Sequence, residues 1–461
     1  MKGLTLENVA KACGGQLKNH NGNGSEAACV VIDSRKIETG GIFIATVGER
    51  VDGHSFINDV AAKGALGVVC EKEPEDCPIP YILVKSSFKA LMDIASLYRA
   101  NIDIPVIGIT GSVGKTSTKE FIASTLSTKY KVLKTEGNYN NEVGMPLTIL
   151  SIRPEHEIAV IEMGISDFGE MERLASVSRP DTCVITNIGN CHLEKLHDRD
   201  GVLKAKTEMF KYLKHDGAIF LNGDDDRLIN VKKPWDREIT YFGMQETNDF
   251  YASDVINKGL LGSDAVICYR KGDSEACMGV HIPIPGDHMV YNALASVAIG
   301  FEYGLTEEEV IKGIASVSPT EGRSHIITTP SYTVIDDCYN ANPVSVKAAI
   351  DLLGKADSRK VAILGDMFEL GKDEEKHHYS IGEYVFLHGV DVLIAIGSLS
   401  KNTYEAAKKG RLDKERKVYY FETKEEAMDS LKDILQKGDA ILVKASHGMH
   451  FEQIVDNLKT V

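Results

Sequence analysis

The sequence predicts an α/β protein of three domains: a small N-terminal α/β domain (1–84), a central domain with a mainly parallel sheet (85–318) and a Rossmann-like C-terminal domain (319–461). Three observations lead to this prediction. The 461 residues are enough for about three domains that each bury a core. Short runs that are apolar on both faces alternate with helix-like stretches, which is typical of a parallel sheet covered by helices. The alternation starts again after residue 318, which indicates a separate third domain.

In the N-terminal domain, the apolar runs that we expect to form strands are 30–32, 42–45, 67–70 and 81–84. A helix-like stretch at 87–100 follows, and we place the boundary at residue 84 because this helix would pack most naturally against the next sheet. Further strands are expected in the central domain at 104–109, 132–134, 157–163, 182–186 and 218–221. Residues 240–285 look like an irregular β-rich insertion. The C-terminal strands are expected at 332–336, 360–364, 390–396, 417–421 and 440–443.

The composition excludes several classes of function. The net charge of −15 argues against an extended nucleic-acid surface, although a local basic pocket for an anionic substrate remains compatible with it. No apolar run approaches the roughly 18 residues of a membrane helix, and residues 1–7 lack a signal-peptide core. The nine cysteines include no Cys-x-x-Cys pair. We therefore expect a cytoplasmic protein whose cysteines are free, mostly buried thiols.

The clearest functional motif lies at 106–118, where an apolar run ends in the glycine-rich segment 111–114 and a helix-like segment begins at Lys115. Such glycines let backbone N–H groups turn toward a phosphate, and the helix N-terminus adds a favourable dipole. Lys115 would reach the terminal phosphates, and the Thr116 hydroxyl would bind magnesium. The general pattern has a further glycine where this chain has Ile109, and an ordinary glycine-rich turn is the alternative. The flanking strand and helix favour ATP or GTP binding.

Polar side chains follow two other predicted strands of the central domain. Glu162 closes the apolar run 157–163, and His192 lies in the loop after the strand 182–186. Ligands of open α/β sheets bind beyond the carboxyl ends of the strands, so both residues are candidates for the same site. Burying an unpaired carboxylate would be costly, and we therefore expect Glu162 to have a cation partner. His192 could instead be an ordinary hydrogen-bonded or solvent-facing loop histidine.

Lys206 lies within an apolar stripe of the helix-like stretch 200–213. Residues three or four positions away on the same face are Val202, Leu203, Met209 and Phe210. A lysine that faces inward must extend its amine to water, find an anion or lose its charge. An uncharged amine can also capture CO2 and become a carbamate, an anionic oxygen ligand suited to magnesium. The periodicity alone leaves these outcomes open.

A second helix start follows Gly286, with Asp287 as the expected N-cap. His288 and Asn292 are four residues apart and would share a face of this helix. Such a polar pair could contact a purine ring or could be a hydrated surface, and the spacing does not decide between them.

Together these motifs resemble the Mur ligase family, the ATP-dependent amide-forming enzymes of peptidoglycan assembly. The matching segments run nearly end to end and occur at 33–35, 52–56, 110–116, 137–141, 162–164, 186–194, 205–210, 292–295, 321–323 and 336–343. Within the family, segments 336–343 and 365–371 resemble the member that joins D-alanyl-D-alanine to UDP-N-acetylmuramoyl-tripeptide. The resemblance implies that ATP phosphorylates the peptide carboxylate, that the dipeptide amine attacks the acyl phosphate, and that the enzyme is a cytoplasmic monomer acting in cell wall synthesis, cell shape and cell division.

The resemblance also implies roles for individual residues. The ATP site would consist of Thr110, Gly111, Ser112, Val113, Gly114, Lys115, Thr116, Asn292 at the adenine, Arg323 and Asp337 at the ribose. Thr116 and Glu162 would hold one magnesium ion, and His192 with a carbamylated Lys206 would hold a second. Lys115, Glu162, His192, Lys206 and Arg323 would be catalytic. The UDP-sugar would contact Ser34 and Arg35, and the muramoyl-peptide side Asn138, Asn140 and Asn141.

The chain departs from the family pattern at two places. Met289 stands where many relatives have asparagine, and Ser446-His447-Gly448 stands where many have Gly-Ser-Arg, so an arginine contact to the dipeptide carboxylate is not carried over. The alternatives are a ligase that adds the third amino acid, a folylpolyglutamate synthase, a phosphate-loop switch or motor protein without ligase activity, and a non-catalytic scaffold. The motifs at 138–141 and 336–343 argue against the first two.

Overall fold

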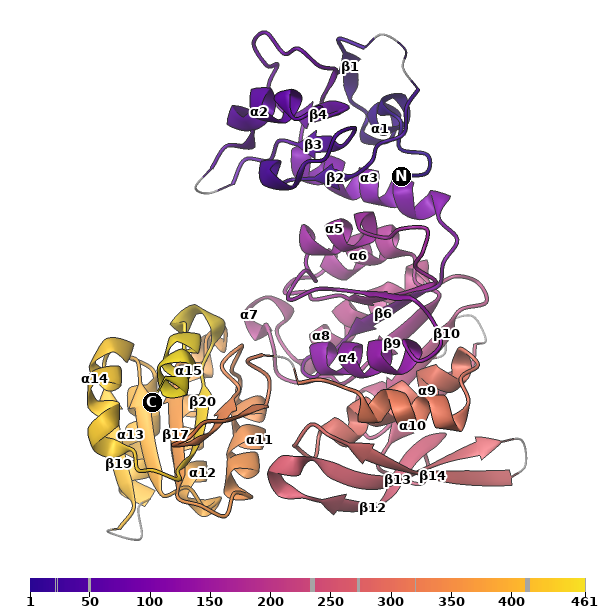
Figure 1. The fold of residues 1–461 in the computed structure, drawn as a ribbon. Coiled ribbons are helices and arrows are strands. Elements are labelled where there is room, and N and C mark those ends of the chain that lie inside the picture. Colours follow the sequence, from indigo (N-terminus) through magenta and orange to yellow (C-terminus); the bar gives the residue numbers. More distant parts are fainter. Residues whose placement is uncertain are drawn as a thin grey trace.

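The structure is a computed structural model that describes residues 1–20, 22, 24–48, 51–232, 237–271, 274–319, 321–410 and 415–460. It contains three sheets that succeed one another along the chain. In Figure 1 the N-terminal unit lies at the top, the central unit lies below it, and the C-terminal unit lies beside the lower part of the central unit. The predicted α/β architecture with three sheets is confirmed.

The N-terminal unit has a five-stranded sheet in the order β1-β5-β4-β3-β2. Its strands are β1 (Gln16–Lys18), β2 (Val30–Val31), β3 (Ile42–Ile44), β4 (Gly67–Cys70) and β5 (Tyr81–Leu83), all parallel except the β1–β5 pair. Helices α1 (Leu6–Cys13) and α2 (Ile57–Ala62) belong to this unit. Helix α3 (Ser87–Asn101) contacts both α1 and the central helices α5 and α6, so a boundary at residue 84 stays a prediction.

The central unit has a nine-stranded sheet in the order β14-β13-β12-β11-β10-β9-β6-β8-β7. Its first strands are β6 (Val106–Thr110), β7 (Val132–Lys134), β8 (Ile158–Glu162), β9 (Thr182–Ile185) and β10 (Ala218–Asn222), all parallel. One face packs on α4 (Lys115–Leu126), α9 (Met289–Glu302) and α10 (Glu307–Ala315). The other packs on α5 (Gly144–Leu150), α6 (Glu170–Ser178) and α8 (Arg199–Thr207), with the short α7 (Leu193–Leu196) before α8. Because side chains alternate across a strand and both faces are covered, every residue of β6, β8 and β9 is buried, whereas the apolar residues of the edge strand β7 are half-buried.

The prediction that residues 240–285 are β-rich is confirmed, but the prediction that they form an irregular insertion is wrong. They form β11 (Ile239–Gly243), β12 (Phe250–Asn257), β13 (Ser263–Lys271) and β14 (Ser274–Ile282), which continue the central sheet. The last pairings are antiparallel, and β14 alternates exposed and buried side chains from Cys277 to Ile282. A strand with one solvated face has about half the apolar residues of a buried parallel strand. The sequence of residues 240–285 therefore lacks the continuous apolar runs of the other strands and looks irregular.

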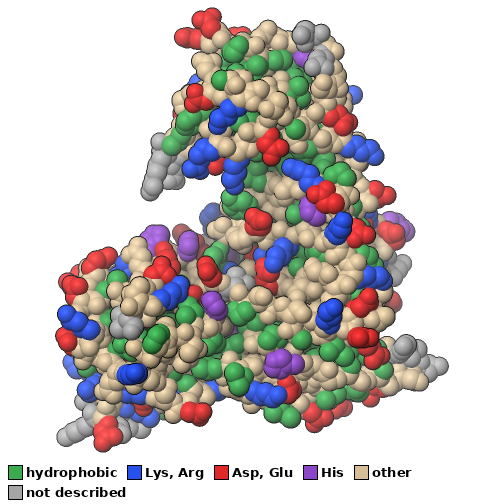
Figure 2. Space-filling view, in the orientation of Figure 1, with side chains coloured by type: hydrophobic (Ala, Val, Ile, Leu, Met, Phe, Trp, Pro, Cys, Tyr) green, Lys and Arg blue, Asp and Glu red, His purple; other side chains and the backbone are tan. Residues whose placement is uncertain are grey.

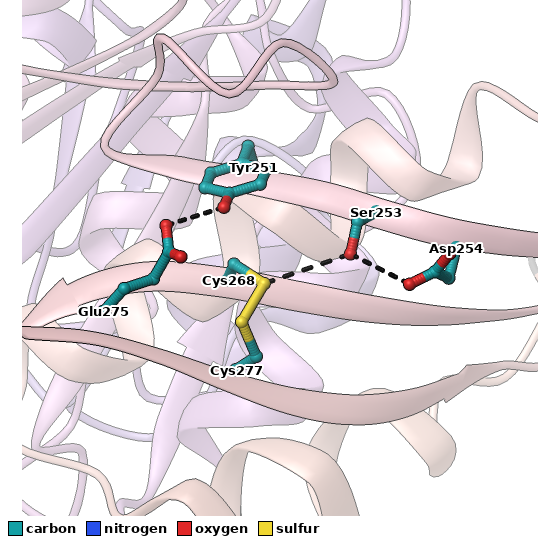
Figure 3. Close-up of a disulfide and its surroundings, with 6 residues drawn as sticks. All are labelled: Tyr251, Ser253, Asp254, Cys268, Glu275 and Cys277. Atoms are coloured by element: carbon teal, nitrogen blue, oxygen red, sulfur yellow. Dashed lines mark hydrogen bonds between the residues drawn. A yellow bond between two sulfur atoms is a disulfide. The ribbon is translucent and has the colours of Figure 1, made fainter.

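The expectation of nine free thiols is also wrong for one pair. Cys268 and Cys277 lie directly opposite each other on β13 and β14 and form a disulfide (Figure 3). Beside it, the Tyr251 hydroxyl donates to Glu275 (2.6 Å). The other cysteines are free thiols, and four of these seven are buried.

The C-terminal unit has a six-stranded sheet in the order β15-β16-β20-β17-β18-β19. The strands are β15 (His325–Thr328), β16 (Thr333–Asp336), β17 (Lys360–Gly365), β18 (Val392–Ile396), β19 (Lys417–Phe421) and β20 (Ala440–Lys444), all parallel except the β15–β16 pair. The helices are α11 (Pro343–Gly354), α12 (Glu374–Leu387), α13 (Ser400–Gly410), α14 (Lys424–Ile434) and α15 (Glu452–Lys459). The five predicted strands are present, and β15 was missed because its residues are only half-buried.

The central and C-terminal units contact each other beyond the polypeptide link. Leu260, in the turn between β12 and β13, packs against the C-terminal core, and Lys355 forms an ion pair with Asp287 (Nζ–Oδ1 2.8 Å). Figure 2 shows a hollow where the C-terminal unit faces the rest of the molecule. None of the helices in the described part of the chain is long and apolar enough to cross a membrane.

Candidate active site at the edge of the central sheet

A cavity of about 970 Å³ lies between the central and C-terminal units. Its walls are the phosphate-loop motif after β6, the segments that follow β7, β8 and β9, the start of α9, and the loops that follow β16 and β17. These are carboxyl ends of parallel strands, the place where open α/β sheets bind ligands. The sequence prediction of a site at this edge therefore coincides with a real cavity.

The phosphate-loop motif is held in place by the loop that follows β9. Asn187 accepts from the backbone N–H of Val113 (3.0 Å) and its amide donates to the Val113 carbonyl (2.9 Å), while the Thr186 hydroxyl donates to the same carbonyl (2.6 Å). Gly114 has φ +82° and precedes the first residue of α4, and a Cβ at Gly111 would overlap the Thr186 hydroxyl. Both positions therefore require glycine, one for its backbone conformation and one for close approach. Asn187 lies in the matched segment 186–194, but its contact with the phosphate loop was not predicted from the sequence.

Lys115 and Thr116 begin α4 at the bottom of the cavity. The Lys115 amine donates to the carbonyl of Gly111 (3.0 Å) and so lies back across its own loop. Burial lowers the pKa of Lys115, and the charge of Glu162 opposes this effect. The Thr116 hydroxyl donates to Glu162 Oε2 (2.9 Å).

Glu162 is buried at the end of β8 and has polar partners instead of a direct lysine or arginine partner. In addition to Thr116, the Asn140 amide donates to its Oε1 (2.8 Å), and its backbone N–H donates to the Thr135 hydroxyl (3.0 Å). The partners of Glu162 among the described residues are neutral donors that satisfy the carboxylate, and a cation partner for it stays a prediction. Asn138, Asn140 and Asn141 line the cavity, and Asn141 also accepts from the backbone N–H of Gly144 (2.9 Å).

His192 lines the cavity, whereas the buried Lys206 is not among the described residues that line it. His192 has φ +51° just before α7, and its Nδ1 lies 3.2 Å from Oε2 of Glu369, which the C-terminal unit supplies. Burial lowers the pKa of His192, and Glu369 opposes this.

Lys206 is 1% exposed on α8, which confirms the inward orientation that the helical periodicity predicted. Burial, with a further contribution from the charge of Lys115, lowers the pKa of Lys206 to about 7. The Lys206 side chain therefore stands near Lys115 as a substantially uncharged amine.

The residues that could hold magnesium provide hard oxygen donors at one place. Within the described residues, no group of three or more His, Cys, Asp or Glu side chains is placed to hold a metal ion. The Thr116 hydroxyl and the Glu162 carboxylate are nevertheless in contact at the mouth of the phosphate loop, and hydroxyl and carboxylate oxygens are ligands that magnesium prefers. The donor set therefore fits a magnesium ion that is completed by phosphate oxygens and water.

The start of α9 and the loop after β16 form another wall of the cavity. Asn292 is buried and accepts from the Thr118 hydroxyl (2.8 Å), and His288 lines the cavity with its pKa lowered by burial. Asp287 does not cap α9 as expected, because its carboxylate pairs with Lys355 and the helix begins one residue later. Both His288 and Asn292 thus line the cavity, Asn292 as a buried residue and His288 as an exposed one.

Asp337 and Arg323 reach the cavity from the C-terminal unit. Asp337 forms an ion pair with the buried Lys444 (2.5 Å) and accepts from the backbone N–H of Ser324 (2.9 Å). The Arg323 guanidinium lies over the Tyr339 ring, 4.1 Å from its centroid. Lys444 and Tyr339 were not identified from the sequence, although both lie next to strand ends.

Ser34 and Arg35 stand apart from this cavity, in the 3₁₀ turn Ser34–Lys36 of the N-terminal unit. Arg35 bonds to Asp33 (2.8 and 2.9 Å) and is largely exposed, and Lys63 donates to the Ser34 carbonyl (2.9 Å). The structure thus brings most of the predicted ATP and metal residues to one cavity: 112–116, Glu162, His192, Asn292, Arg323 and Asp337. Thr110, Gly111 and Lys206 do not line it, and the predicted UDP-sugar residues lie at a separate place.

Comparisons with known proteins match almost the whole chain. Family models match residues 26–107 (Mur ligase family, catalytic domain), 109–300 (Mur ligase middle domain) and 322–447 (Mur ligase, glutamate ligase domain). The chain is 37% identical over 98% of both chains to a Bacillus subtilis protein named UDP-N-acetylmuramoyl-tripeptide–D-alanyl-D-alanine ligase. It is 31% identical to an Escherichia coli protein of the same name, over 100% of this chain and 99% of that one.

Solved structures agree with these relatives. A crystal structure of MurF from Acinetobacter baumannii superimposes with a TM-score of 0.89 at 30% identity over 99% of both chains. MurF from Thermotoga maritima in complex with ADP superimposes with a TM-score of 0.80 at 28% identity, over 94% of this chain and 97% of that one.

Proposed function

Because the chain belongs to the Mur ligase family, we propose that it is an ADP-forming ligase that joins D-alanyl-D-alanine to UDP-N-acetylmuramoyl-tripeptide. The observation that carries the proposal is the 37% identity over 98% of both chains to a relative of that name. The cavity supports it independently, because it gathers a phosphate loop, Lys115 and Arg323, and the buried amine of Lys206 is close enough to Lys115 to be influenced by its charge.

The chemistry explains why these residue types are needed. A carboxylate oxygen of the peptide attacks the γ-phosphorus of ATP, ADP leaves, and the dipeptide amine then displaces phosphate from the acyl carbon. The two reacting groups of the first step are both anions that repel each other, so the site must concentrate positive charge. Lys115 and Arg323 provide charge from opposite units, and each is close enough to influence the other.

We assign the remaining roles as part of this proposal. Segment 110–116 would bind the phosphates, Asn292 the adenine, and Asp337 the ribose. Thr116 and Glu162 would hold one magnesium ion, and His192 with Lys206 a second; bound magnesium would neutralise charge on the phosphates and on the reacting carboxylate. The Lys206 amine would add to CO2 and release a proton, leaving an anionic carbamate.

Substrate contacts belong to the same proposal. Asn138, Asn140 and Asn141 would contact the muramoyl-peptide, and Ser34 with Arg35 the UDP-sugar. Arg35 is mostly exposed, and Asp33 is its one ion-pair partner among the described residues, so it is available to an anionic ligand. The enzyme would act as a cytoplasmic monomer in peptidoglycan synthesis, and thereby in cell shape and division. Likeness to a diaminopimelate ligase and to a folylpolyglutamate synthase, at 17% identity each, concerns the fold alone.

The proposal is tested by measuring ADP, phosphate and peptide product with purified protein. ATP is supplied with the UDP-tripeptide that carries either lysine or diaminopimelate at its third position, with and without D-alanyl-D-alanine. We expect one amide and one phosphate per ADP, only when both acceptor and tripeptide are present. Phosphate release at the same rate with and without the two peptides would instead identify a nucleotide hydrolase.

A further inference from the structure

The motif 365–371, Gly-Asp-Met-Phe-Glu-Leu-Gly, contains none of the proposed ATP, metal or substrate residues. It follows β17 and is fixed by side chains from three other elements. The Met367 N–H donates to Nε2 of the buried His378 on α12 (2.9 Å), and the Phe368 N–H donates to the Ser446 hydroxyl after β20 (2.8 Å). Asp366 accepts from both the N–H and the hydroxyl of Ser400 on α13 (2.7 Å each). A loop held at three consecutive residues presents the next residue in one position.

That next residue is Glu369, which projects from the C-terminal unit into the cavity. Its backbone has φ +62°, and its side chain is 72% exposed although it lines the cavity. Oε2 lies 3.2 Å from Nδ1 of His192 on the central unit. Glu369 therefore stands against His192, on the side of the cavity where the proposed function places the carboxyl group to be activated.

Glu369 differs from the other acids in this cavity. The described acids that line it and already have cationic or amide partners are Glu142 with Arg173, Glu162 with Asn140, Glu170 with the Ser166 N–H, and Asp337 with Lys444. Glu369 is paired with His192 alone among the described residues, and its side chain is 72% exposed. One carboxylate of the cavity is thus available to a cationic ligand.

A cation is what the second substrate brings. The α-amino group of a peptide has a pKa of about 7.7–8, so at neutral pH it arrives mostly as an ammonium ion. Lys115 and Arg323 would repel it from the phosphate side of the cavity. We propose that the Glu369 carboxylate forms an ion pair with the α-ammonium group of the acceptor dipeptide and so places that nitrogen beside the acyl phosphate, where loss of a proton to water frees the amine lone pair for attack. This inference rests on the proposed function and names a substrate-binding residue for it.

The test compares two nucleophiles for the same acyl phosphate. Hydroxylamine is largely uncharged at neutral pH and needs no ammonium site, and it would convert the acyl phosphate to a hydroxamate with release of phosphate. Glu369→Gln and Glu369→Ala are assayed with D-alanyl-D-alanine and with hydroxylamine. The matched control is Glu375→Gln, which removes an exposed carboxylate from the nearby first turn of α12.

We expect both Glu369 variants to raise the KM for the dipeptide by about 10- to 100-fold, the loss that accompanies removal of a hydrogen bond to a charged group. Hydroxylamine-dependent ADP release and the KM values for ATP and UDP-tripeptide should stay within about twofold of the unmodified enzyme, and Glu375→Gln should leave all of them unchanged.

An equal loss with both nucleophiles would overturn the inference, because Glu369 would then act on the first step through His192. An unaltered dipeptide KM would overturn it as well. The proposed function fails differently: the unmodified enzyme would then form neither hydroxamate nor amide, and the inference would fall with it.

Discussion

Lys206 provides the sharpest quantitative prediction. With its pKa at about 7, about three quarters of the Lys206 amine is uncharged at a pH of about 7.5. An ordinary lysine, with a pKa of about 10.5, is uncharged in only about one molecule in a thousand at that pH. Burial near Lys115 thus increases the population that can react with CO2 by several hundredfold. Because only the uncharged amine reacts, the carbamate should be lost as the pH falls below about 7.

Two perturbations follow from this. Lys206→Ala should lower the rate of amide formation by at least about 100-fold, because it removes a proposed metal ligand. Short-chain carboxylates should restore part of the activity by replacing the carbamate. Lys204→Ala, which removes an exposed lysine from the same helix, is the control and should remain active. Enzyme depleted of CO2 should lose activity and regain it with bicarbonate, and ¹³C-bicarbonate should give a carbamate signal that is absent in Lys206→Ala.

The reasoning is refuted if Lys206→Ala turns over like the unmodified enzyme. It is also refuted if the ¹³C spectrum has no carbamate signal and activity is indifferent to bicarbonate. Loss of activity in Lys206→Ala without rescue and without any ¹³C signal would mean that the lysine acts as an amine.

Three further predictions concern stability and covalent structure. Gly111→Ala should reduce the free energy of unfolding, measured by urea denaturation, by about 1–3 kcal/mol, because its Cβ would overlap the Thr186 side chain. Gly279→Ala is the control and should change this free energy little, because Gly279 has open space around it. Equal effects of the two substitutions would contradict the prediction. Burial lowers the pKa of His378, so below about pH 6.5 the unfolded chain binds a proton that the folded chain resists, and unfolding should become easier as the pH falls. His378→Gln should weaken that dependence in thermal melts at several pH values, and an unchanged slope would count against it. Thiol titration of the unfolded chain should find seven thiols before reduction and nine after it; nine at both stages would exclude the disulfide.

Local sequence patterns were sufficient for the strands of the parallel sheets. Their apolar runs are continuous because both faces are buried, so each strand is visible without knowledge of its neighbours. The inward orientation of the Lys206 side chain was predictable for a related reason, because helical periodicity is a local property of the sequence. The glycine-rich turn after β6 was predictable in the same way, because its signal lies within residues 111–114.

Properties that depend on pairing between distant segments were not predictable. The Cys268–Cys277 disulfide depends on the register of β13 and β14, which brings the two residues opposite each other. Asn187 acts on the phosphate loop from a separate strand, and Glu369 reaches His192 from another unit altogether. A sequence lists such residues as ordinary loop positions, because the contact that gives them a role exists only in three dimensions.

The central claim is that this cavity couples ATP cleavage to amide formation through a phosphorylated carboxylate. Tripeptide labelled with ¹⁸O in its terminal carboxylate tests this most directly. The account predicts that each turnover transfers one ¹⁸O atom from the peptide to the released phosphate, detectable by mass spectrometry. Released phosphate that contains no ¹⁸O from the peptide would contradict it, because the carboxylate would then never have attacked ATP.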